Sequence, residues 1–205
     1  MKKNILKYIL ACWLIISFLF SFISLSRCED VEKDKALSEF IVYYDKGYVE
    51  NHYFPSKLNS DSETIEFDDG YKENPQSGNT CIKIKYTGAG DFGWAGLYWV
   101  NPAGNWGEQK GGYNLDFAKK LTFWARGEKG GEHIAGFKFG GLKGLNSDSD
   151  SYGIGPIVLK TEWQQITIDL TGMDMRRIGL GFSVAISKAY NRKGCIFFID
   201  NVKYE

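Results

Sequence analysis

Short apolar runs separated by glycine-rich turns are the feature that most limits the fold of this chain. Residues 81–86 (CIKIKY) show the pattern best, because isoleucine and tyrosine alternate with cysteine and lysine. An alternation of period two places apolar side chains on one face of a β-strand and charged ones on the other. No stretch of the sequence has the periodicity of a long amphipathic helix. The pattern therefore predicts an all-β protein.

About nine strand candidates follow one another behind residue 39, and most connections between them contain glycine. Glycine occurs 24 times against four prolines, and aromatic residues make up 16% of the chain, which suits many short strands joined by tight turns. This spacing predicts one β-sandwich domain over residues 39–205. The candidates are residues 40–44, 81–86, 94–100, 121–126, 133–139, 156–159, 164–170, 178–186 and 195–204.

The N-terminus has the pattern of an export segment. Three lysines precede an apolar stretch that runs from Tyr8 to Leu25. We expect residues 1–27 to be a signal peptide or a helical membrane anchor, and the charged residues 28–38 to be a linker. Lipidation at Cys28 is a third alternative. Each of these places the domain outside the cytoplasm, either secreted or tethered at the cell surface or in the periplasm.

Charge and cysteine content narrow the partners and the covalent structure. The 25 basic residues balance 25 acidic ones, so nothing favours a nucleic-acid backbone. In an oxidising compartment, Cys81 and Cys195 could form a disulfide, because each opens a predicted strand. Both could equally be buried free thiols.

Catalytic motifs are missing from the sequence. Its two histidines, His52 and His133, lie in no metal-binding spacing, and no nucleophile elbow or phosphate-binding loop is present. We therefore expect a protein that is not an enzyme. A glycoside hydrolase is the less favoured alternative, because two distant carboxylates could meet across a cleft without a sequence signature.

Aromatic and planar polar side chains gather in residues 92–113. Trp94, Tyr98, Asn101 and Trp106 are candidate ligand-binding residues there, since flat rings beside amides are suited to sugars. Alternation places Trp94 and Tyr98 on one strand face and Leu97 with Trp99 on the other, so we expect Trp99 in the core. Trp106 lies in a loop and is the best candidate for exposure.

Two further strands contribute candidates. Trp124 and Arg126 share one face of their strand, where the arginine could bind sugar hydroxyls or a carboxylate, or could simply cover its neighbour and pair with an acid. Small residues alternate with large ones over residues 178–186, and Lys138 would line a groove above them. A loop packed closely over these small residues is the competing explanation. The small residues are Gly179, Gly181, Ser183 and Ala185.

Several of these stretches together resemble secreted bacterial jelly-roll domains related to carbohydrate-binding modules of the galactose-binding-like fold. The resemblance extends over residues 39–205. It rests on residues 45–47, 51–53, 55–56, 81–86, 94–99, 105–107, 120–128 and 198–202. It implies a jelly-roll β-sandwich that binds a polysaccharide without catalysis.

The resemblance also implies a metal. In similar jelly rolls the aspartate that matches Asp200 helps to hold a structural calcium ion, and Asp45 could be its partner. A strand-end aspartate that hydrogen bonds to a turn is the alternative. For the partner as well, a second hypothesis stays open: an envelope adhesion module whose aromatic face contacts protein, or a module that works beside a separate enzyme.

Overall fold

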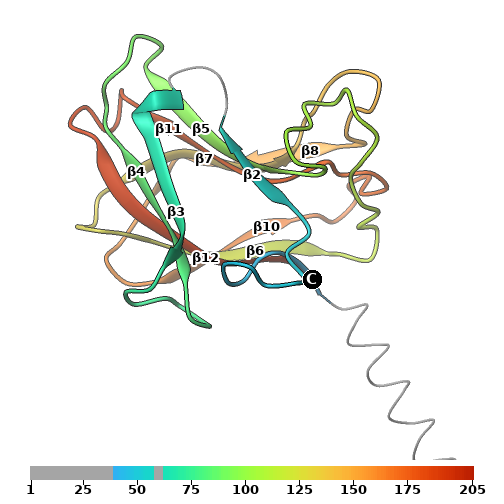
Figure 1. Cartoon of the computed structure of the whole chain (residues 1–205), viewed down its shortest axis with the longest axis horizontal. Helices are drawn as coiled ribbons and strands as arrows, with labels where there is room; N and C mark the ends of the chain where they lie inside the picture. Colours follow the sequence, from blue (N-terminus) through green and yellow to red (C-terminus); the bar gives the residue numbers. More distant parts are fainter. Residues whose placement is uncertain (1–38, 58–61) are drawn as a thin grey trace, which may run out of the picture. The chain divides into compact units, whose positions relative to one another are not determined.

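Two antiparallel sheets make up the computed structural model, which describes residues 39–57 and 62–205 (Figure 1). Within these residues there are twelve strands and one short 3-10 turn, η1 (Ser62–Thr64). The strands are β1 (Phe40–Tyr43), β2 (Phe54–Lys57), β3 (Ile65–Tyr71), β4 (Cys81–Tyr86), β5 (Trp94–Val100), β6 (Lys120–Gly127), β7 (His133–Gly140), β8 (Ser151–Ile154), β9 (Ile157–Val158), β10 (Gln164–Asp169), β11 (Leu180–Ser187) and β12 (Cys195–Tyr204).

The strand order separates neighbours in sequence into different layers. Sheet A has the order β10-β6-β12-β4-β3, and β1 also pairs with β12. Sheet B has the order β2-β5-β11-β7-β8, and β9 also pairs with β7. In Figure 1, β2, β5, β7, β8 and β11 lie in one layer and β6, β10 and β12 in the other. This arrangement is the predicted β-sandwich.

The core lies between the two sheets and is rich in aromatic rings. Phe123 of β6 packs against Phe137 of β7 and Phe182 of β11, with ring centroids 4.6 and 4.9 Å apart. All three side chains are fully buried. Burial of one such ring contributes roughly 1.5–3 kcal/mol to stability. Contacts of this kind join the two sheets into one domain.

The nine predicted strands all occur, and the structure adds β2, β3 and β8 in segments that gave no strand candidate. β2 contains Pro55, which cannot donate a ladder hydrogen bond and is tolerated because β2 is an edge strand. β3 and β8 also lie at sheet edges, where one strand face meets solvent and the apolar alternation is weak. Their signal in the sequence was therefore too polar to recognise.

The two cysteines of the domain are free thiols, so the disulfide alternative is wrong. Both lie on neighbouring strands, but the register of β12 on β4 places Cys195 opposite Tyr86, at the far end of β4 from Cys81. Burial raises the pKa of both thiols to about 12. They behave as small buried side chains that stay protonated near neutral pH.

The predicted export segment and linker, residues 1–27 and 28–38, lie outside the described residues. Glu39–Glu205 form a compact unit by themselves. Among the residues that the structure describes, no helix is long and apolar enough to cross a membrane.

Candidate functional site

The outer face of sheet B carries the densest group of predicted site residues. Ala95, Leu97 and Trp99 of β5 point into the core, so Trp94 and Tyr98 point outward, as their alternation requires. The two outward rings start four residues apart, roughly 13 Å along the strand. Both are half-buried, and Trp99 is buried as predicted.

Tyr98 lies flat on the sheet. A Cβ atom added at Gly96 would come within 2.6 Å of the Tyr98 ring, so the ring covers this glycine, which leaves room for it. Tyr98 also packs against a small apolar cluster that is separate from the main core. The cluster consists of Val100, Leu142 and Leu180. Burial raises the pKa of Tyr98, and its hydroxyl therefore remains a neutral donor. The result is a supported ring with one face against the protein.

Trp106 extends this aromatic surface from the neighbouring loop. Its ring meets the Tyr98 ring edge-on at 5.6 Å between centroids, and 37% of the residue is exposed. The buried Asn105 side chain holds the loop, because its Nδ2 donates to the carbonyls of Asn101 and Gln109 and its Oδ1 accepts main-chain N–H groups. Gly107, at φ +99°, lets the loop approach the Lys143 backbone. Trp106 is thus presented by an ordered loop.

Small side chains continue the surface across the sheet. Ser183 and Ala185 of β11 alternate with core residues and point outward, and Gly136 of β7 lies opposite Ala185. Lys138, exposed on β7, lies opposite Ser183 and, on its other side, opposite Gly153 of β8. The predicted link between Lys138 and a floor of small residues is therefore present.

Two of the four small residues that were predicted to line the groove, Gly179 and Gly181, do not lie on this outer surface. Gly181 faces the core, where an added Cβ would come within 2.5 Å of the Tyr53 ring. Gly179 lies under the loop that contains Leu142, with which its Cβ would make contact at 3.0 Å. The register shift between Leu180 and Phe182 breaks the regular alternation, which is why these two glycines do not join Ser183.

Asn101 has a structural position. Its Nδ2 donates to the His52 carbonyl at 3.2 Å and to the Tyr113 hydroxyl at 2.9 Å, and its Oδ1 accepts from the Gly112 main chain at 3.1 Å. The amide thus joins three segments of the chain. Because its polar atoms are used in this way, Asn101 supports the Trp106 loop instead of offering its amide to a ligand.

Trp124 and Arg126 lie on the outer face of sheet A, so the structure divides the predicted site residues between opposite sides of the sandwich. Leu121, Phe123 and Ala125 of the same strand are in the core. The Arg126 guanidinium stacks on Phe198 at 3.8 Å from the ring centroid. The guanidinium thus covers a ring of the neighbouring strand β12, whereas the alternative had it cover Trp124 and pair with an acid.

Other groups cover part of this face. The Arg126 guanidinium is also 5.1 Å from the centroid of the Trp163 ring, a residue that the sequence patterns did not single out. Trp163 Nε1 donates to the Asn74 carbonyl of the loop behind β3. No acid pairs with Arg126 in the described part of the chain. These contacts cover part of the outer face of sheet A.

Asp45 and Asp200 both hold the loop of residues 76–80. Asp200 Oδ2 accepts the N–H groups of residues 76 and 77 at 2.7 and 3.1 Å, and Asp45 accepts those of residues 79 and 80 at 2.9 and 2.7 Å. These N–H groups occupy the carboxylate oxygens and place partial positive charge where a cation would have to bind. The described residues also contain no group of three or more His, Cys, Asp or Glu that could hold an ion. The arrangement does not fit a calcium site, and calcium remains a prediction from the resemblance.

Asp200 should give the stability of the domain an unusual pH dependence. Burial is the largest effect on this carboxyl and raises its pKa from 3.8 to about 6. The folded state therefore binds the proton more tightly than the unfolded state does. The stabilising contribution is complete below about pH 4 and is lost as the pH rises through about 6.

The test compares urea unfolding of the wild type with that of Asp200→Asn. We expect the wild-type free energy of unfolding, relative to the variant, to fall by on the order of 3 kcal/mol between about pH 4 and about pH 7. Asp169→Asn is the control, because hydrogen bonds from Thr171 lower the pKa of Asp169 and the slope should have the opposite sign. An Asp200 difference that is constant or rises with pH would contradict this assignment.

An exposed ring beside the sheet B surface was missed. Phe54 of β2 is 48% exposed and lies opposite Val100, next to the cluster that supports Tyr98. Its segment was expected to be a loop, so no face could be assigned to its side chain. The dipeptide Phe54–Pro55 was the only sequence feature that marked the start of this strand.

Comparisons with known proteins agree with this architecture. No family model and no curated protein matches the chain significantly. Solved structures do match: a family 11 carbohydrate-binding module from Clostridium thermocellum, in complex with a β-1,3-1,4-mixed-linked tetrasaccharide, has 16% identity and a TM-score of 0.51 over 81% of this chain and 94% of its own. A family 30 carbohydrate-binding module has 16% identity and a TM-score of 0.56 over 82% and 98%.

A second family 30 module, from a cellulosomal cellulase of Clostridium thermocellum, has 14% identity and a TM-score of 0.53 over 82% of this chain and 96% of its own. Identities this low relate folds and do not transfer binding residues. The described domain therefore has the jelly-roll β-sandwich fold of carbohydrate-binding modules.

Proposed function

We propose that this domain binds a polysaccharide without catalysis, on the outer face of sheet B. The observation that carries the proposal is the Tyr98 ring, which lies over Gly96 on the sheet, with the Trp106 ring 5.6 Å away at an angle of 70°. A supported ring offers its outer face to the apolar C–H face of a pyranose. The fold, shared with carbohydrate-binding modules, supports the same function.

Polar groups next to the rings supply the hydrogen bonds that a sugar needs. Lys138 is exposed on β7 and can donate to hydroxyl oxygens, and Trp94 continues the aromatic surface along β5. The small residues between them leave the sheet surface accessible to a chain. An open surface of this kind suits the interior of a polysaccharide better than a chain end.

The same face lacks the groups of a glycosidase. Glycoside hydrolysis needs two carboxylates that flank the scissile bond. The outward strand residues described above are aromatic, small or basic. This composition of the strand residues supports binding without hydrolysis. If the predicted leader exports the domain, polysaccharides outside the cell are its ligands, and a separate enzyme would have to act on them.

Tryptophan fluorescence tests the proposal. The protein is titrated with soluble β-glucans, xylans, mannans and pectins. We expect a saturable shift with one polysaccharide, and an affinity about 30-fold weaker in Trp106→Ala, because truncation of a central aromatic contact costs about 2 kcal/mol.

Trp124→Ala is the matched control, since it removes a tryptophan from the opposite sheet and should leave the affinity unchanged. Loss of binding in Trp124→Ala with retention in Trp106→Ala would move the site to sheet A. If no polysaccharide of the panel changes the fluorescence of the wild type, the hypothesis of an adhesion module that contacts protein is favoured.

A further inference from the structure

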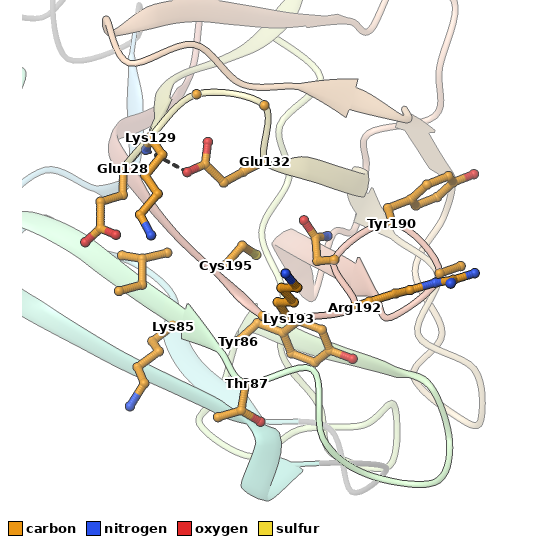
Figure 2. Close-up of a pocket in the computed structure, with 16 residues that line it drawn as sticks. Lys85, Tyr86, Thr87, Glu128, Lys129, Glu132, Tyr190, Arg192, Lys193 and Cys195 are labelled. Carbon is orange, nitrogen blue, oxygen red and sulfur yellow. Dashed lines mark hydrogen bonds between the residues drawn. The ribbon is translucent and has the colours of Figure 1, made fainter.

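A cavity of about 870 Å³ is lined by residues that include none of the predicted binding residues (Figure 2). Its walls come from the end of β4, from the β6–β7 turn at residues 128–132, and from residues 189–196 of the β11–β12 connection and β12. Its volume falls within the range of roughly 300–1,000 Å³ that small-molecule sites occupy. Walls on several sides suit a single sugar residue or a chain end.

The walls are ordered by hydrogen bonds. The buried Asn191 side chain donates to the His133 carbonyl at 2.7 Å and accepts from the His133 main chain at 3.3 Å, which joins the β11–β12 connection to β7. On the other side, the Glu128 main chain donates to the Ile196 carbonyl at 3.0 Å. The cavity is therefore built from segments that the fold holds in place.

Basic side chains predominate around this cavity, although the whole chain has no net charge. Four basic residues line it against two acidic ones. In the part of the chain that the structure describes, Lys129, Arg192 and Lys193 form no ion pair. In the view of Figure 2, Lys129 and Lys193 flank Cys195, and Arg192 extends toward the rim. The unpaired cations suit an anionic group.

A buried carboxylate orders the β6–β7 turn that forms one wall of the cavity. Glu132 is only 7% exposed, and its Oε1 accepts the Lys129 main-chain N–H at 2.8 Å (Figure 2). Its Oε2 is buried and has no hydrogen-bond partner among the described residues. This oxygen lies against Gly127, where an added Cβ would strike it, so Glu132 holds the wall of the cavity and its carboxylate is closed to a ligand.

An aromatic ring stands at the rim. Tyr190 is 53% exposed and stacks on His133, with ring centroids 5.4 Å apart and an angle of 17° between the rings. The backing by His133 fixes the ring with its other face free for an apolar surface. The cavity thus offers cations for an acid group and a ring for C–H groups.

We propose that this cavity is a second carbohydrate site, specific for a uronic acid, a sugar residue that carries a carboxylate. The carboxylate would bind Lys129 and Lys193, and the apolar face of the sugar would pack on the Tyr190 ring. The inference adds to the polysaccharide surface on sheet B a separate site for acidic sugar residues at the end of the sandwich, and it rests on the proposed function only for the class of ligand.

Calorimetric titration of the full protein with the trisaccharides of galacturonic acid and of galactose tests the site. We expect the acidic trisaccharide to bind saturably, with an affinity that falls as salt is added, and the neutral one to bind at least tenfold more weakly. The charge-reversal variant Lys129→Glu/Lys193→Glu should lose the acidic ligand. The matched control Lys72→Glu/Lys119→Glu has the same net charge change at exposed positions outside the cavity and should keep it.

Trp106→Ala separates this site from the one on sheet B. We expect this variant to bind the acidic trisaccharide like the wild type, even where it loses the polysaccharide of the fluorescence panel. Equal weakening in both charge-reversal variants would reduce the effect to general electrostatics and overturn the proposal. Absence of binding to the wild type, or loss of binding in Trp106→Ala, would overturn it as well, whatever the outcome of the polysaccharide panel.

Discussion

Replacement of Gly96 by valine should weaken polysaccharide binding about 30-fold while the domain stays folded. The Cβ at this position would come within 2.6 Å of the Tyr98 ring, so the ring must leave the sheet surface. The ring sits at the end of a flexible side chain, and valine favours strands, so the strand itself can persist. The measurement is the fluorescence titration, with circular dichroism melting as the test of folding.

Gly136→Ala is the control for Gly96→Val. It adds a methyl group to the same face, where the nearest atom is the Ile154 carbonyl oxygen at an ordinary contact distance of 3.5 Å. We expect wild-type stability and, because no ring is displaced, a much smaller loss of affinity than in Gly96→Val. Unchanged binding in Gly96→Val would show that the position of the Tyr98 ring does not matter to the ligand.

Gly181→Ala should lower the free energy of unfolding by about 1–3 kcal/mol, the range for overpacking in a core. An added Cβ would come within 2.5 Å of the Tyr53 ring. The ring cannot easily withdraw, because its hydroxyl donates to the Ile178 carbonyl at 2.8 Å. On the same strand segment, the Tyr204 hydroxyl donates to the Gly181 carbonyl at 2.6 Å. Urea unfolding measures the loss.

A double-mutant cycle assigns that loss to its cause. Tyr53→Leu removes the ring that Gly181→Ala would strike, so the double variant should lose less stability than the sum of the two single losses. Additive losses would place the effect of Gly181→Ala elsewhere, for example in the backbone of β11.

The sequence was informative wherever alternation persisted. Leu97 shares a strand face with Trp99, and that sufficed to place Trp99 in the core and Tyr98 outside. The alternation failed at Gly181, because one register shift between Leu180 and Phe182 reverses the facing of the residue between them. A bulge of this kind leaves no mark in a pattern of large and small residues.

Long-range pairing was the part that could not be predicted. Trp124 and Tyr98 look equivalent as outward rings on apolar strands, but the strand order assigns β6 to sheet A and β5 to sheet B. From the sequence, the Asn101 amide was a candidate to bind ligand. In the structure it donates to the His52 carbonyl and the Tyr113 hydroxyl, which are distant in the sequence. The cavity at the end of the sandwich gathers residues from three connections, and no local motif announces it.

Resonance mapping of a bound oligosaccharide tests the central claim most directly. Amide chemical shifts of the isotope-labelled protein are followed during titration with an oligosaccharide of the polysaccharide that binds in the fluorescence panel. The proposed function predicts that the perturbed amides lie on β5, β7 and β11 and in the Trp106 loop, with β6, β10 and β12 unaffected. Perturbations confined to the Trp124 and Arg126 side of sheet A, or none at saturating ligand, would contradict a binding surface on sheet B.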